Sequence, residues 1–115
     1  QKELFIVGAE CATLMTDLQT LPKRVTDDHV SSLEKLYEET KGSVAPVKGF
    51  VTPGDTISSA NIHLARTIVR RAERRAVKLR REGQISRNVV KYLDVLSGLL
   101  FYLAVFEEES EKKQI

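Results

Sequence analysis

The sequence is poor in the residues that cross-link, break or turn a chain. It has one cysteine, Cys11, three prolines and no tryptophan among 115 residues. A single cysteine excludes a disulfide framework and a cysteine-rich zinc site, and it is typical of a protein in the reducing cytoplasm. Asn-Gly and Asp-Gly turns are absent and no long alternating segment occurs, so strands are poorly supported. We therefore expect an all-α, cytoplasmic protein.

Long hydrophobic runs are also missing. The longest apolar stretch covers residues 95–106, whereas a membrane-spanning helix needs roughly 20 residues. The beginning of the sequence shows no signal-peptide pattern. Hydrophobic residues make up 42% and charged residues 30% of the sequence, which is ordinary for a folded domain. We expect no membrane partner and interpret residues 95–106 as part of a buried core helix.

Apolar residues at steps of three and four predict four helices, over about residues 2–18, 27–42, 57–81 and 87–106. Thr26 and Ser86 are the expected N-caps of the second and fourth helices. Gly42 and Gly83 are the expected ends of the second and third. Short connections favour an antiparallel helical bundle. We expect residues 1–106 to form one bundle of four to five helices, and residues 107–115 to form a charged tail that frays.

The long helix predicted over residues 57–81 has two different faces. One side gathers apolar residues, which we interpret as the core stripe: Ile57, Leu64, Ile68, Ala72, Ala76 and Leu79. The opposite side gathers polar residues: Ser59, His63, Arg66, Arg70 and Glu73. Two guanidiniums one turn apart suit phosphate oxygens, and a nearby carboxylate can hold a divalent cation that bridges those phosphates. From periodicity alone, the alternative is a solvated helix face with ordinary Arg–Glu pairs.

Basic charge is concentrated in the same helix. Eight basic residues lie between Arg66 and Arg81, although the formal net charge of the chain is only +2. The cluster is either a local anion-binding field or a solvated face. The competing function is a helical module that binds nucleic acid or a partner protein through residues 66–81. Glu73 interrupts the basic face and no aromatic residues are interleaved there for base stacking, so we expect no nucleic-acid partner.

The last predicted helix is apolar nearly all round. Its expected core face holds six residues: Val89, Tyr92, Leu93, Leu96, Leu100 and Leu103. Val90, Phe101 and Val105 lie on the other side, beside Asp94 and Gly98. A helix of this kind is buried on both sides. Because a small bundle is not expected to bury such a helix alone, the pattern predicts a subunit interface, where Gly98 would permit close approach.

Three segments together resemble the hallmark of the PduO-type ATP:cob(I)alamin adenosyltransferases. They are residues 50–54, 63–67 and 70–74, with the sequences FVTPG, HLART and RRAER. Residues 92–97 and 99–101, YLDVLS and LLF, resemble the last conserved helix of that family. Leu4, Phe5 and residues 8–10 match the family more loosely. The likeness covers most of the chain and is strongest between residues 50 and 103.

The resemblance implies a homotrimer of five-helix subunits that binds ATP and cobalamin at the subunit interfaces. It implies that Arg66 and Arg70 contact the triphosphate or brace the neighbouring subunit, and that Glu73 helps to hold Mg²⁺. Phe50 would lie near the corrin ring and favour loss of its lower axial ligand. Asp94 would bind the nucleotide, where the family usually has Asn. The implied reaction transfers the 5′-deoxyadenosyl group of ATP to cob(I)alamin, giving adenosylcobalamin and triphosphate. A reductase and an adenosylcobalamin-dependent enzyme are the expected partners.

The sequence also departs from the family pattern. The Thr- and Gly-rich nucleotide loop of the family's N-terminus is not among these residues, and Gly98 replaces the usual Asp. Asp55 stands where a second Gly usually follows the Pro-Gly pair. His63 lacks the motif of an axial cobalt ligand, so we expect a structural histidine at a helix contact.

Overall fold

The computed structural model describes residues 24–44, 56–83 and 85–113, together with Glu3, Leu4, Ile6 and Ala9. Side chains of the last stretch are described as far as Glu109. These parts contain three complete helices, α2 (Asp27–Gly42), α3 (Ile57–Arg81) and α4 (Arg87–Lys113). The four separate N-terminal residues also have helical backbone, and no strand occurs in the described ranges. The all-α prediction is confirmed for this part of the chain, whereas Cys11 and Phe50 lie outside it.

The helix ends follow from local capping chemistry. At the start of α2, the His29 backbone N–H donates to Thr26 Oγ1 at 3.3 Å, and the Thr26 N–H donates to His29 Nδ1 at 3.0 Å. This reciprocal pair satisfies two donors that the first turn would otherwise leave open. Thr56 caps α3 with a single bond, in which its side chain accepts from the Ser59 N–H at 3.1 Å. Gly83 follows α3 with φ of 75°, a conformation that glycine adopts readily.

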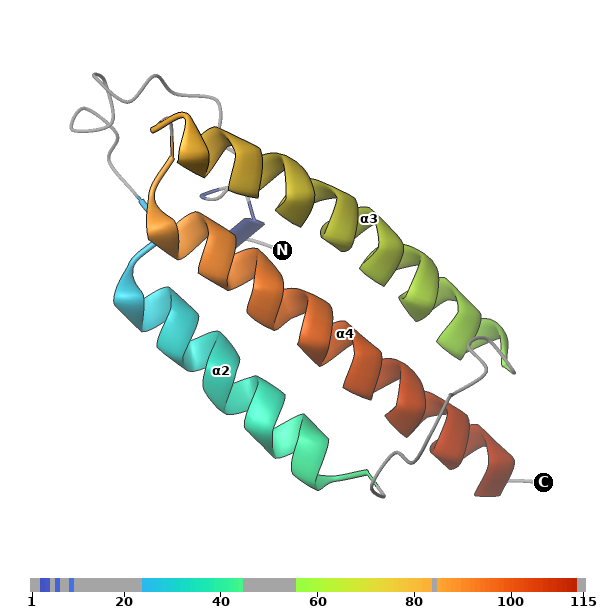
Figure 1. Cartoon of the computed structure of the whole chain (residues 1–115). Helices are drawn as coiled ribbons and strands as arrows, with labels where there is room; N and C mark the ends of the chain where they lie inside the picture. Colours follow the sequence, from blue (N-terminus) through green and yellow to red (C-terminus); the bar gives the residue numbers. More distant parts are fainter. Residues whose placement is uncertain are drawn as a thin grey trace.

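Helix α4 is the middle one of the three (Figure 1). It packs against α3 on one side and α2 on the other. The colour gradient in Figure 1 shows that α3 runs antiparallel to α4, whereas α2 runs in the same direction as α4. Successive helices therefore alternate in direction, as in an antiparallel bundle, and the parallel pair α2 and α4 lies two steps apart in the chain. The buried core draws on all three helices and the residues beside them: Val25, Val30, Leu33, Ala76, Ile85, Val89, Tyr92, Leu93 and Leu99.

The middle position of α4 changes the interpretation of its apolar surface. Both sides of α4 are packed within this chain, and Val105, which we assigned to a subunit interface, is only 8% exposed. Residues Arg87–Glu109 are long and apolar enough to cross a membrane by length and composition, and they form a longer segment than the apolar stretch of residues 95–106. The core helix of a soluble protein passes the same test. Its packing between α2 and α3 favours the core-helix interpretation.

Helix α4 remains packed beyond residue 106, as far as Glu109, the last residue whose side chain is described. The helix continues to Lys113, beyond its expected end near residue 106. Glu108 is only 7% exposed, and it accepts a hydrogen bond of 2.6 Å from the Ser59 hydroxyl of α3. Ser59 is itself fully buried. This contact attaches the end of α4 to the first turn of α3.

We expect Ser59→Ala to lower the free energy of unfolding by about 1–3 kcal/mol, because the buried Glu108 carboxyl loses a hydrogen-bond donor. Ser58→Ala is the matched control, since Ser58 is exposed and adjacent. Urea unfolding followed by circular dichroism measures both variants. Equal unfolding midpoints for the two would show that the Ser59–Glu108 contact does not stabilise the fold.

The packed side of α3 differs from the predicted one. Ile57, Leu64 and Ile68 are 83%, 61% and 57% exposed and Ala72 is exposed as well, so the predicted core stripe is wrong from Ile57 to Ala72. Ala76 is buried and Leu79 packs against the core, as expected. The polar residues Ser59, His63, Arg66 and Glu73 are instead buried or half-buried. Ser59 has a hydrogen-bond partner on α4, Glu108, whereas His63 and Arg66 pack against the Phe101 ring and keep one enclosed nitrogen each without a hydrogen-bond partner among the described residues.

Candidate functional site

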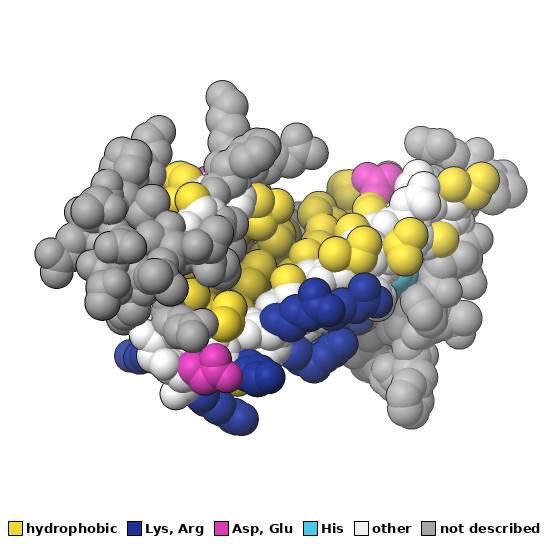
Figure 2. Space-filling model, turned by 90° about the horizontal axis from the view of Figure 1, so that it is seen from above, with side chains coloured by type: hydrophobic (Ala, Val, Ile, Leu, Met, Phe, Trp, Pro, Cys, Tyr) yellow, Lys and Arg dark blue, Asp and Glu magenta, His cyan; other side chains and the backbone are white. Residues whose placement is uncertain are grey.

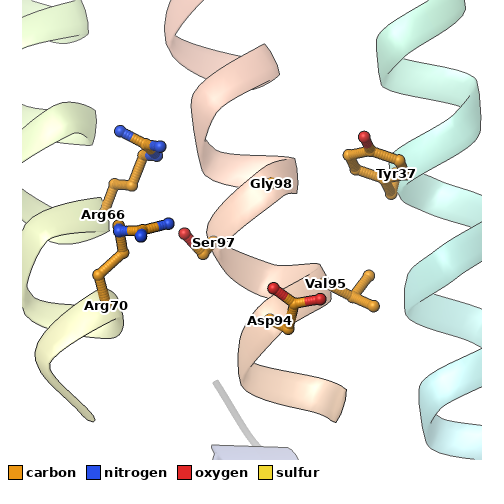
Figure 3. A pocket seen from close by; sticks show the side chains of 7 residues that line it. All are labelled: Tyr37, Arg66, Arg70, Asp94, Val95, Ser97 and Gly98. Carbon is orange, nitrogen blue, oxygen red and sulfur yellow. The ribbon is translucent and has the colours of Figure 1, made fainter. Parts of the chain in front are cut away.

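A cavity of about 280 Å³ lies over α4, between α3 and α2 (Figure 3). Arg66 and Arg70 project from α3 towards α4, and Asp94 and Ser97 lie on the facing part of α4. Tyr37 approaches from α2 on the other side. The cavity has seven lining residues: Tyr37, Arg66, Arg70, Asp94, Val95, Ser97 and Gly98.

Arg66 is positioned by an aromatic ring. Its guanidinium carbon lies 5.3 Å from the centre of the Phe101 ring of α4, within the range of a cation–π contact. The Arg66 Nε atom is enclosed and has no hydrogen-bond partner in the described part of the chain. His63 packs against the same ring, with the two ring centres 6.3 Å apart and the planes at 62°. Both side chains of α3 are therefore held against one residue of α4.

Two carboxyl groups meet beside the arginines. Burial, the largest cause, raises the pKa of Glu73, and the neighbouring Asp94 carboxyl raises it further, whereas Arg70 and Arg74 act in the opposite direction. Asp94 lines the cavity directly. Two like charges at one place disfavour the doubly ionised state, and a bound cation would relieve their repulsion. The pair therefore has the electrostatics of a cation site next to an anion site.

The raised pKa of Glu73 has a consequence for stability. Above the ordinary glutamate pKa of about 4.3, the folded protein binds more protons at Glu73 than the unfolded chain does. The stability that this difference provides is fully present below that value and is lost as the pH rises through the raised pKa. We expect the loss of stability with rising pH to be smaller in Asp94→Asn. The contribution of Asp94 to the raised pKa of Glu73 is then removed, and only the contribution of burial remains. Unfolding free energies measured from about pH 4 upward test this expectation. Identical pH profiles of the unsubstituted protein and Asp94→Asn would contradict the interaction between the Glu73 and Asp94 carboxyl groups.

Gly98 leaves space for the cavity to extend across α4. A Cβ atom at this position would lie 2.9 Å from Tyr37 Cε2, closer than side chains tolerate. The close approach predicted for Gly98 therefore occurs, but with α2 of the same chain. Tyr37 also packs edge-on against Tyr102 of α4, with ring centres 5.6 Å apart. Burial, followed by the nearby Tyr102, raises the pKa of the Tyr37 phenol.

Known proteins are similar to this chain in sequence and in the arrangement of their helices. The sequence profile of the family described as cobalamin adenosyltransferase matches residues 1–107. The chain belongs to the cobalamin adenosyltransferase family. It is 36% identical over 108 residues to a corrinoid adenosyltransferase of Citrobacter freundii, a match covering 94% of this chain and 61% of that protein. It is 38% identical over 108 residues to a corrinoid adenosyltransferase of Mycobacterium tuberculosis, covering 90% and 55%.

The structural likeness agrees with the family assignment. A variant PduO-type ATP:corrinoid adenosyltransferase from Lactobacillus reuteri, complexed with cobalamin and ATP, superposes with a TM-score of 0.80 at 31% identity. The match covers 96% of this chain and 62% of that one. The chain thus spans about three fifths of the length of these relatives. The resemblance recognised in the sequence motifs is confirmed.

Within the family, the structure gathers most of the predicted site. Arg66, Arg70 and Asp94 line one cavity, and Glu73 adjoins it through Asp94. His63 lies at a helix contact, as expected for a structural histidine. Phe50 lies outside the described residues. The sequence did not single out Tyr37, and it placed Phe101 on an outer face. The signal in the sequence for both residues is an aromatic side chain within a predicted helix.

Proposed function

We propose that this protein transfers the 5′-deoxyadenosyl group of ATP to cob(I)alamin. The observation that supports this most strongly is the cavity in which Arg66 and Arg70 stand beside a pair of carboxyl groups. Guanidinium groups bind phosphate oxygens by paired hydrogen bonds, and carboxylates bind the cation that accompanies a polyphosphate. Membership of the cobalamin adenosyltransferase family supplies the corrinoid as the second substrate.

The reaction requires charge stabilisation more than a protein nucleophile. The Co(I) centre of the reduced corrinoid attacks the 5′ carbon of the ATP ribose, a Co–C bond forms and the C–O bond to the triphosphate breaks. The triphosphate leaves with additional negative charge. Arg66 and Arg70 would stabilise that charge because their donors are already oriented before the reaction. No general acid or base is needed in this scheme.

A magnesium ion fits the acidic part of the site. Mg²⁺ prefers oxygen ligands and is commonly bound by one or two carboxylates together with substrate phosphates. Glu73 and Asp94 provide such carboxylates, and their mutual repulsion favours a cation between them. No cluster of three or more acidic, histidine or cysteine ligands occurs in the described residues, so the phosphates would complete the coordination. When bound, the ion would neutralise charge on the triphosphate.

The corrinoid would lie beyond the described part of the site. We propose that Phe50 packs near the corrin ring and disfavours its lower axial ligand, which makes Co(II) easier to reduce to Co(I). The sequence resemblance supports this role, since residues 50–54 carry the family motif. A reductase would supply the electron, and an adenosylcobalamin-dependent enzyme would receive the product in the cytoplasm.

We also propose a homotrimer. The support is the stripe of Ile57, Leu64 and Ile68, which α3 exposes on the side turned away from α4. Figure 2 shows hydrophobic side chains gathered into a band beside a row of Lys and Arg side chains. Large exposed apolar side chains at helical spacing are typical of a surface that a further chain segment or subunit covers. Sedimentation equilibrium tests the proposal, and a monomer at every concentration would contradict it.

The experiment that tests the activity mixes the protein, expressed at its natural full length, with MgATP and chemically reduced cob(I)alamin without oxygen. We expect an ATP-dependent, light-sensitive alkylcobalamin spectrum. A folded protein that produces no such species would refute the proposed function. Nucleic-acid binding with a steep dependence on salt, in the absence of turnover, would instead favour the basic helix as a phosphate-backbone binder.

A further inference from the structure

The two sides of the cavity differ in charge. Arg66 and Arg70 border it from α3, whereas Tyr37 borders it from α2, on the opposite side of α4 (Figure 3). Val95 points from α4 towards the Tyr37 side, and Asp94 lies on α4 between the two sides. A nucleotide is divided in the same way, with anionic phosphates at one end and an uncharged nucleoside at the other. The lining therefore matches a nucleotide whose phosphates lie towards α3 and whose nucleoside lies towards α2.

The Tyr37 ring lies close against α4 because position 98 has no side chain. A Cβ atom at Gly98 would lie 2.9 Å from Tyr37 Cε2, so a larger residue there would displace the ring. Tyr102 holds the same ring edge-on, with ring centres 5.6 Å apart. The Lys41 ammonium lies 5.9 Å from the ring centre. These contacts from α2 and α4 fix the aromatic wall of the cavity before a ligand binds.

The phenol of Tyr37 remains uncharged beside a polyphosphate. Burial, followed by the nearby Tyr102, raises its pKa above the ordinary value. A phenolate would repel phosphate oxygens, whereas a neutral ring offers a flat apolar surface to a sugar or a base. Aromatic side chains commonly provide such surfaces for nucleobases, because every base has a π face.

We propose that Tyr37 is a specificity-determining residue that packs against the nucleoside of the nucleotide while the arginines of α3 hold its phosphates. The inference rests on the proposed function and deepens it, because it gives the direction in which ATP lies across α4. The 5′ carbon joins the nucleoside to the phosphates. It would therefore lie over α4, between Arg70 and Tyr37.

The test compares two ligands that share the phosphates and differ in the nucleoside, MgATP and inorganic tripolyphosphate with magnesium. Calorimetry measures the affinity of the full-length protein and its variants for each ligand. Tyr37→Leu is expected to weaken MgATP binding about five- to tenfold and to change tripolyphosphate binding by no more than about twofold. Tyr37→Phe retains the ring and is expected to bind both ligands to within about twofold of the unsubstituted protein.

Tyr92→Phe is the control for lost stability, because it changes a tyrosine outside the cavity. Tyr92 is 4% exposed, and its hydroxyl donates to Glu3 Oε2 at 2.6 Å. Loss of this hydrogen bond should lower the free energy of unfolding. The affinity for MgATP relative to tripolyphosphate should stay unchanged.

A double-mutant cycle with Gly98 tests the contact that places the ring. Gly98→Ala should displace Tyr37 and weaken the binding of MgATP more than that of tripolyphosphate. In a Tyr37→Leu background, Gly98→Ala should cause no further loss, because leucine has no atom in the position of Cε2.

Equal losses for the two ligands in Tyr37→Leu, or unchanged MgATP affinity, would overturn the role of Tyr37 alone. The same holds if Tyr37→Phe or Tyr92→Phe weakens MgATP binding as much as Tyr37→Leu does, or if the losses in the cycle are additive. Failure of the unsubstituted protein to bind either ligand would overturn both this role and the proposed function. Circular dichroism and urea unfolding establish that the compared variants are folded.

Discussion

Arg70→Ala is expected to lower kcat/KM for ATP by about 10²- to 10³-fold while the fold is retained. Arg70 lines the cavity from α3, and it is exposed rather than packed in the core. Removal of this donor, which is oriented towards the departing triphosphate, therefore raises the free energy of the transition state more than it lowers the stability of the fold. Turnover is measured by the anaerobic cobalamin assay, and folding by circular dichroism.

Arg71→Ala provides the control for this prediction. Arg71 is the next residue of α3, carries the same charge and is exposed, but it does not line the cavity. Its loss should change turnover by no more than about twofold, the size of effect expected for an exposed charge. Equal effects of the two substitutions would mean that general positive charge, and not the geometry of the site, assists the reaction.

Glu73→Gln is expected to raise the magnesium concentration required for half-maximal turnover by at least about tenfold. Substitution of a group that supports a metal site typically weakens metal affinity by about this much. The neutral amide also removes the repulsion with Asp94, so the free energy of unfolding at neutral pH should not fall. Titration of turnover with MgCl₂ at constant ATP measures the first effect, and urea unfolding measures the second. The combination of weaker activity and undiminished stability is specific to a functional carboxylate.

Glu82→Gln is the matched control for this variant, since Glu82 is the exposed C-cap residue of the same helix. An unchanged magnesium requirement in Glu73→Gln would contradict the cation site. A lower stability of Glu73→Gln would show that the carboxylate is retained for packing with α4.

The ends of the helices could be predicted because their causes are local. The Thr26 cap requires only His29, three residues later, and Gly83 ends α3 through its own backbone conformation. The continuation of α4 to Lys113 could not be predicted in this way. The buried contact in this part of the helix is with Ser59, which is 49 residues away from Glu108 in the sequence and contacts it only after α3 and α4 have packed.

The orientation of α3 also depends on its neighbour. The helix carries one apolar stripe through Leu64 and Ile68 and a second, interrupted by polar residues, through Ile62, Val69 and Ala76. Periodicity favoured the first stripe, because polar residues normally face solvent. The second stripe packs on α4, whose Phe101, Asp94 and Glu108 provide partners for those polar residues.

The part of the candidate site that lies on α3 could be predicted from the sequence. Arg66, Arg70 and Glu73 recur at helical spacing on α3, and their pattern is visible in the sequence. Tyr37 and Gly98 become neighbours only through the packing of α2 on α4. A glycine within a helix indicates close approach but does not identify the segment that approaches.

We propose that the polar side of α3, turned towards α4, holds the triphosphate of ATP. The most direct measurement is a titration with MgATP followed through the side-chain Nε–Hε resonances of the arginines. We predict saturable shifts for Arg66 and Arg70, and none for Arg80 and Arg81, which are exposed at the other end of the same helix. Shifts confined to Arg80 and Arg81, or spread evenly over all the arginines of α3, would contradict the claim.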